Sequence, residues 1–253
     1  MYRFRKYSAR CLVLLALGCG ASVRAPTASS PSNAPTVGTQ TASGRTIDEA
    51  SVQPRINAPY FQPGALDRYT RILEAESREV VQHRDDILNS MDLAEGMVVA
   101  DIGAGTGFFT TELAKRVGDT GTVLAVDIVP AFLDRIRERV RAEQLTNVTV
   151  VEGEERATGL DPASVDLAFM CDTYHHIEYP QAYMLSLFQT LRHGGTLVLI
   201  DFKRIEGTTS PSRLKHVRAD EQTVLEEVSA VGFVLEAEIN LLEDNYYLRF
   251  RRP

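Results

Sequence analysis

One short segment constrains the fold of this chain more than any other. Residues 98–102 (Val-Val-Ala-Asp-Ile) have the apolar character of a buried strand, and Gly103, Gly105 and Gly107 follow them directly. A helical pattern then begins at Phe108. Glycines at a turn between a strand and a helix let the backbone approach a ligand closely. We therefore expect a strand–turn–helix unit with a ligand site at its turn.

After this segment, short β-branched runs alternate with helical patterns. The expected strands are 97–101, 122–127, 148–152, 165–171 and 196–201, and the expected helices are 108–117, 131–143, 181–191 and 221–231. Such βαβ alternation predicts a parallel sheet covered by helices on both faces. Two final strands, 233–239 and 246–251, flank a polar turn and should form an antiparallel hairpin. We expect an α/β fold: a Rossmann-like three-layer sandwich whose seven-stranded sheet is mostly parallel, with an antiparallel final strand.

The spacing of the glycines indicates the kind of ligand. Dinucleotide-binding folds use G-x-G-x-x-G to seat a pyrophosphate, whereas this run is G-x-G-x-G and is preceded by Asp101, which would repel a phosphate. A carboxylate suits a cationic ligand, and S-adenosylmethionine carries an ammonium and a sulfonium but no phosphate. The pattern Asp101-x-Gly103-x-Gly105-x-Gly107 resembles motif I of the class I methyltransferases.

The resemblance covers roughly residues 76–252 and is closest in character to the small-molecule branch that includes the ubiquinone and menaquinone C-methyltransferases. Residues 166–177 and 191–201 carry it beyond motif I. It implies S-adenosylmethionine as the cofactor and methyl transfer to a small-molecule acceptor that the sequence does not identify. The family usually has Gly-Asp after its third strand, with the acid receiving the adenine amino group; here Glu154 and Glu155 stand at that place.

A second carboxylate supports this interpretation. Asp127 closes the strand 122–127, twenty positions after Gly107, where it can accept hydrogen bonds from both ribose hydroxyls. The alternative is that it caps the next helix. The expected cofactor-binding residues are Asp101, Gly103, Ala104, Gly105, Thr106, Gly107, Asp127, Ile128, Glu154, Glu155 and Asp172.

Candidate catalytic residues follow the fourth strand, because ligands of open α/β sheets gather at the carboxyl ends of strands. Asp172 and Tyr174 are expected beside the cofactor. One of the adjacent histidines, 175 and 176, is a candidate general base and the other a buried core residue. Residues 215–218 are expected to cover the acceptor pocket, or else to form a solvated loop. The predicted catalytic set is His175, Tyr174 and His216, with Arg218 also near the acceptor.

No metal site is expected from the sequence. His175 and His176 are adjacent, and adjacent side chains diverge on a strand or a helix. No H-x-E-H or C-x-x-C spacing nearby completes a ligand set.

The first 19 residues resemble an export signal. Four basic and no acidic residues precede an apolar run that ends at Cys19, and the run is too short to cross a bilayer. Residues 16–19 (Ala-Leu-Gly-Cys) resemble a bacterial lipoprotein box, in which the cysteine receives lipid. We expect a leader over 1–19 and an exported lipoprotein attached to a membrane through Cys19; a misread leader would leave the protein in the cytoplasm.

Residues 20–65 are rich in small residues and proline without periodicity, which predicts a disordered linker before a methyltransferase domain over 66–253. The formal net charge of −7 provides no basic field for a phosphate backbone, so a nucleic-acid partner is not expected. Cys171 has no partner within the domain for a disulfide. The oligomeric state is not predicted.

Two other functions remain open at this point. One is a non-catalytic module, tethered to a membrane, that binds S-adenosylmethionine or S-adenosylhomocysteine. The other is a nicotinamide-dependent oxidoreductase, which the glycine spacing disfavours. Export also poses a difficulty for a methyltransferase, because the cofactor is made in the cytoplasm.

Overall fold

The computed structural model describes residues 47–253. The predicted leader, its Cys19 and residues 20–46 of the predicted linker lie outside this range. The strands are β1 (Val98–Ile102), β2 (Thr122–Asp127), β3 (Val148–Glu152), β4 (Val165–Cys171), β5 (Leu191–Phe202), β6 (Val234–Glu238) and β7 (Asn245–Arg251). The helices are η1 (Ala58–Phe61), α1 (Ala65–Leu73), α2 (Glu79–Gln82), α3 (Arg84–Asn89), α4 (Thr110–Val117), α5 (Pro130–Ala142), η2 (Tyr174–His176), α6 (Pro180–Thr190), α7 (Pro211–His216) and α8 (Glu221–Ala230).

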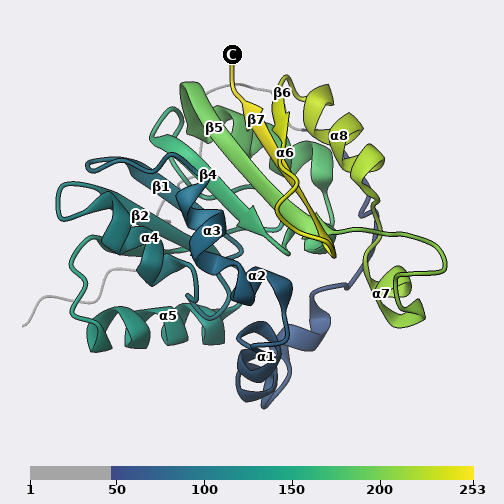
Figure 1. Cartoon of the computed structure of the whole chain (residues 1–253), viewed down its shortest axis with the longest axis horizontal. Coiled ribbons are helices and arrows are strands. Elements are labelled where there is room, and N and C mark those ends of the chain that lie inside the picture. Colours follow the sequence, from purple (N-terminus) through teal and green to yellow (C-terminus); the bar gives the residue numbers. More distant parts are fainter. Residues whose placement is uncertain (1–46) are drawn as a thin grey trace, which may run out of the picture. The chain divides into compact units, whose positions relative to one another are not determined.

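All seven strands form one sheet in the order β3-β2-β1-β4-β5-β7-β6 (Figure 1). The first five strands pair in parallel, and β7 pairs antiparallel with both β5 and β6. The predicted hairpin is therefore present, with its second strand inserted between β5 and β6. This arrangement confirms the expected Rossmann-like α/β fold.

The strand β5 is longer than expected, because it begins at Leu191 rather than at residue 196. Leu191 pairs with Val165, and the register shifts before Leu167 pairs with Thr196. A Cβ atom at Gly195 would lie 2.8 Å from the carbonyl oxygen of Arg192. A side chain does not fit there, so the glycine allows the strand to pass through this irregularity.

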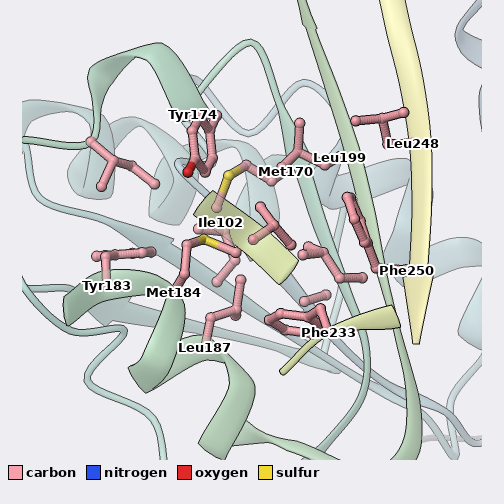
Figure 2. Close-up of a cluster of buried hydrophobic side chains, with 14 of the residues drawn as sticks. Ile102, Met170, Tyr174, Tyr183, Met184, Leu187, Leu199, Phe233, Leu248 and Phe250 are labelled. Carbon is pink, nitrogen blue, oxygen red and sulfur yellow. The ribbon is translucent and has the colours of Figure 1, made fainter. Parts of the chain in front are cut away.

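Strict alternation in the central strands divides the core into two layers. In β4, Ala168 and Met170 belong to a cluster that α6 and α8 cover, which Figure 2 shows around Tyr174 and Met184. Leu167 and Phe169 belong to a second cluster, which α3 and α4 cover. Both faces of the sheet are thus buried, as a parallel sheet requires.

The N-terminal part of the described chain differs from expectation. Val52 N–H donates to the Glu178 carbonyl oxygen (2.9 Å), and the Ser51 hydroxyl donates to the Glu178 carboxylate (2.8 Å). Residues 47–65 are therefore packed on the domain, and the predicted linker boundary at residue 65 is wrong for them. The stretch that follows forms three short helices, α1 to α3. No helix in the described range is long and apolar enough to cross a membrane.

We predict that Phe169→Ala destabilises the domain by about 3–5 kcal/mol, because the ring is fully buried at the centre of the sheet and packs edge-on against Phe109 at 5.0 Å. The matched change Phe61→Ala removes a ring that is 53% exposed, and it should alter the free energy of unfolding by less than about 0.5 kcal/mol. Urea unfolding of the two variants checks this. Equal losses would contradict the assignment of Phe169 to the core.

Candidate functional site

A pocket lies at the carboxyl ends of the first four strands of the sheet. Its wall includes Gly103 after β1, Ile128 after β2, Glu154 after β3 and Asp172 after β4. It encloses about 1120 Å³, including its open mouth. This is the edge of an open α/β sheet where ligands bind. Ten of the predicted cofactor-binding residues line it: Asp101, Gly103, Ala104, Gly105, Thr106, Asp127, Ile128, Glu154, Glu155 and Asp172.

The glycine-rich loop has the left-handed backbone that the sequence pattern suggested. At Gly103 φ is +68°, and a Cβ atom there would lie 2.9 Å from the Cβ atom of Thr173. The glycine thus allows the loop after β1 to lie against the loop after β4. Gly107 differs from expectation, because it does not line the pocket. Its φ is +77° and a Cβ atom would lie 3.2 Å from Ile136 of α5, so Gly107 serves packing between helices.

The carboxylate of Asp127 joins two of the loops that surround the pocket. Its Oδ2 accepts a hydrogen bond from Gly105 N–H (2.8 Å), and its Oδ1 accepts one from Val129 N–H (2.9 Å). Burial raises the pKa of Asp127 to about 6, and these hydrogen bonds oppose the rise. Val129 is itself the N-cap of α5 and has no capping side chain, so Asp127 does not cap that helix. Its remaining lone pairs are available to a ligand.

Asp101 lies beside it, 4% exposed at the end of β1. Among the described residues, the hydrogen bond to this carboxylate comes from the Thr110 hydroxyl (2.6 Å). Burial, together with the neighbouring Asp127, raises the pKa of Asp101 to about 7, and the Thr110 hydrogen bond opposes this. Two buried carboxylates side by side give this part of the pocket a negative potential that favours a cation.

The carboxylate of Asp172, which lines the pocket, already has two partners within the protein. It forms an ion pair with Arg78, and Asn245 Nδ2 donates to its Oδ1 (2.6 Å). Burial raises the pKa of Asp172 to about 6, while Arg78 opposes the rise. The carboxylate of Glu79 accepts the N–H groups of residues 243–245 at the start of β7. The pocket wall is thereby tied to the N-terminal helices and to the last strand.

The sequence interpretation missed one wall of the pocket, which the N-terminal segment supplies through Asn57, Tyr60, Leu73 and Arg78. The ring of Tyr60 stacks against Tyr69 with centroids 4.2 Å apart. The available signal was the pair of aromatic residues 60–61 at the end of a stretch otherwise rich in small residues. An aromatic pair is unusual in a disordered linker.

Tyr174 and Arg218 do not lie where they were expected. Tyr174 is fully buried, and its hydroxyl donates to Glu227 Oε2 (2.6 Å) rather than facing the pocket. Burial and the Glu227 carboxylate both raise the pKa of this phenol. Arg218 makes a bidentate ion pair with the same Glu227 (2.9 and 2.7 Å). The expectation that Tyr174 lies beside the cofactor is therefore wrong. Tyr174 and Arg218 instead form a hydrogen-bond network around Glu227 of α8.

The adjacent histidines take different environments. His175 Nδ1 lies 2.7 Å from Asp201 Oδ1 in the core; burial lowers the pKa of His175, but the Asp201 carboxylate outweighs it and holds that pKa above its ordinary value. His176 lines the pocket, with its Nε2 3.1 Å from the Tyr60 hydroxyl, and burial lowers its pKa well below the usual range. Of the pair, His176 rather than His175 meets the pocket. His216, from α7, lies against both and outside the pocket lining.

The expectation that the side chains of His175 and His176 diverge is wrong. Their ring centroids are 4.2 Å apart, because η2 is a single 3-10 turn and not a strand or an α-helix. Both rings also lie 5.0 Å from the ring of His216, measured between centroids. The three side chains therefore form one cluster.

Comparison with known proteins gives consistent matches. A family model described as a methyltransferase domain matches residues 99–195. The 2-methyl-6-phytyl-1,4-hydroquinone methyltransferase 2 of Oryza sativa subsp. japonica is 35% identical over 46% of this chain and 33% of its own. A ubiquinone/menaquinone biosynthesis C-methyltransferase of Shewanella halifaxensis is 27% identical over 46% of this chain and 47% of its own. The chain thus spans a third to a half of the curated relatives it matches.

A solved structure covers more of the chain. The crystal structure of an S-adenosylmethionine-dependent methyltransferase from Aquifex aeolicus is 26% identical, with a TM-score of 0.68 over 76% of this chain and 100% of that one. Residues 99–195, which the family model matches, include the glycine-rich loop and the strands β2 to β4.

The two buried carboxylates generate a prediction about pH. The pKa of Asp101 in the folded state, about 7, lies above its ordinary 3.8, so the native protein holds an extra proton between these values. The free energy of unfolding should therefore fall as pH rises through this window. Asp101→Asn should remove its share of the slope, up to about 1.4 kcal/mol per pH unit, while Asp127 keeps a contribution of the same sign.

Urea unfolding at pH values between about 4 and 7 measures this slope. Asp119→Asn is the matched control, because it makes the same substitution in an exposed turn. A slope that is unchanged in Asp101→Asn would show that the Asp101 carboxyl does not titrate as its burial requires.

Proposed function

We propose that this chain, which carries a class I methyltransferase domain, transfers the methyl group of S-adenosylmethionine to a small-molecule acceptor. The observation that carries the proposal is the pair of buried carboxylates, Asp101 and Asp127, around a glycine-rich loop at the carboxyl ends of β1 and β2. This arrangement suits a cationic nucleoside ligand and repels a pyrophosphate. A dinucleotide is therefore a poor fit.

The residues of the pocket fit this cofactor in three places. The negative potential at Asp101 suits the ammonium group, and the free lone pairs of Asp127 suit ribose hydroxyls. Glu154 and Glu155 both line the pocket after β3, where either carboxylate suits the adenine amino group. Phe132 of α5 and Tyr183 of α6 add apolar surface to the same wall.

When bound, the cofactor supplies a methyl group on a sulfonium, which is already an activated leaving group. The chain then has to align two reactants and exclude water, which requires few catalytic side chains. The Arg78–Asp172 ion pair and the Asn245–Asp172 hydrogen bond hold the wall of the pocket in place. Of the predicted catalytic histidines, neither His175 nor His216 lines the pocket; His176 does, together with Tyr60.

We take hydroquinones as the acceptor class to test first. Two relatives are named for hydroquinone or quinone methylation, although they match only part of their length. The pocket also has aromatic residues in its lining, among them Tyr60, Phe108 and Phe132, which suit a flat apolar ring.

The proposal predicts micromolar or tighter binding of S-adenosylmethionine and S-adenosylhomocysteine to the full-length protein in calorimetric titration. Asp127→Ala should weaken both at least about tenfold, because it removes a charged hydrogen-bond acceptor and frees the loop at Gly105. Asp134→Ala is the control, since this carboxylate is exposed on α5. Circular dichroism checks that each variant is folded.

The outcomes separate the competing functions. Binding followed by formation of S-adenosylhomocysteine with a hydroquinone panel would support methyl transfer. Binding without turnover on any acceptor would favour the non-catalytic module. Absence of cofactor binding to the wild type would contradict the proposal, and binding of NADH in its place would favour an oxidoreductase.

We also infer that the protein is an exported lipoprotein attached to a membrane through Cys19, on the strength of the basic and apolar leader that precedes this residue. In a bacterial host, Cys19→Ser should abolish incorporation of labelled palmitate and shift the protein out of the membrane fraction. Cys11→Ser, in the same leader, should change neither. A wild-type protein that takes up no label would contradict this inference.

A further inference from the structure

Three of the five histidines of the chain meet at one point of the fold. His175 and His176 come from η2 after β4, and His216 comes from the end of α7, 40 positions along the chain. Each of the three offers one ring nitrogen such that all three nitrogens lie within 4.8 Å of one another. These histidines come together because the end of α7 packs against η2.

The ring of His175 is held as a metal ligand would be. Its Nδ1 faces Asp201 Oδ1 at 2.7 Å, and its backbone N–H donates to Asp201 Oδ2 (3.0 Å). Because a carboxylate accepts hydrogen bonds, this contact keeps the proton on Nδ1 and leaves the lone pair on Nε2. Histidines that bind a metal usually donate their other ring N–H to a carboxylate or carbonyl group. This contact fixes the tautomer and the orientation of the ring.

His176 adds an independent observation. Its Nε2 contacts the Tyr60 hydroxyl, whereas its Nδ1 is buried and has no hydrogen-bond partner among the described residues. A buried ring nitrogen without a partner is uncommon, because its desolvation is not repaid. An ion bound in the cluster would satisfy it.

The chemistry of the three ligands limits which ions the cluster can bind. Three imidazole nitrogens without a thiolate suit zinc, copper, nickel or iron rather than calcium or magnesium. Zinc binds imidazole nitrogens at about 2.0–2.1 Å in a tetrahedron, which places ligand atoms roughly 3.3 Å apart. The widest separation in the cluster, up to 4.8 Å, therefore has to shorten by up to about 1.5 Å on binding, to which side-chain rotation of the half-buried His216 contributes.

We propose that His175, His176 and His216 form a site for one divalent transition-metal ion, with zinc as the reference ion. Three protein ligands leave a fourth position, as in zinc sites that bind a water or a substrate. Since His176 also lines the pocket, the proposed site adjoins the part of the pocket that His176 forms. A ligand with an anionic or ionisable oxygen, such as a phenol, suits it.

The test measures zinc bound to the purified full-length protein after exhaustive dialysis, by elemental analysis, together with the visible absorption of the cobalt-substituted protein. Neither readout depends on methyl transfer. We expect one zinc per chain in the wild type and a tetrahedral, nitrogen-rich cobalt spectrum. His216→Ala should lose both, and circular dichroism checks that this variant of a half-buried residue remains folded. Asp201→Asn should weaken zinc binding about 10–100-fold.

The double variant His83→Ala/His193→Ala is the control, because these are the two histidines outside the cluster. It should retain the zinc and the cobalt spectrum of the wild type. The proposal is overturned if the wild type holds no zinc when incubated with the ion. It is also overturned if His216→Ala binds zinc as tightly as the wild type, or if the control variant loses the ion.

Discussion

The carboxylate of Asp127 is the contact on which the geometry of the pocket depends. One oxygen holds Gly105 in the loop after β1 and the other holds Val129 at the start of α5, so a single side chain sets the distance between two adjacent loops. Burying an ionisable group in this way raises its pKa and costs stability, which the two backbone hydrogen bonds partly offset. The domain thus bears the destabilisation of a buried carboxylate at the pocket, where that carboxylate can hydrogen-bond to a ligand.

A second set of contacts ties the pocket wall to segments outside the central strands. Arg78, just before α2, pairs with Asp172 after β4, and Asn245 of β7 donates to the same carboxylate. Three segments that are far apart in the chain therefore converge on Asp172, which itself has a positive φ of +49°. Residues 47–65 are held separately, by hydrogen bonds from Ser51 and Asn57 to Glu178 and to the His176 carbonyl oxygen.

The central features of the fold and of the cofactor side could be predicted because they rest on local signals. Short β-branched runs defined the strands, and Gly103 and Asp127 stand at or next to strand ends. Two of the failures involve contacts between distant segments. Gly107 resembles the other glycines in sequence, yet only the approach of Ile136 explains it. Tyr174 follows a strand end as expected, but the position of Glu227 on α8 turns its hydroxyl into the core.

The same distinction separates two parts of the pocket lining. The part with Asp101 and Asp127 consists of strand ends, so the motif identifies its residues. Another part combines η1 with η2, through Tyr60 and His176, and the ring of His216 from α7 contacts the ring of His176. No spacing in the sequence relates these segments, because the folded loops alone bring them together. Part of the pocket lining therefore comes from residues that a motif search does not connect.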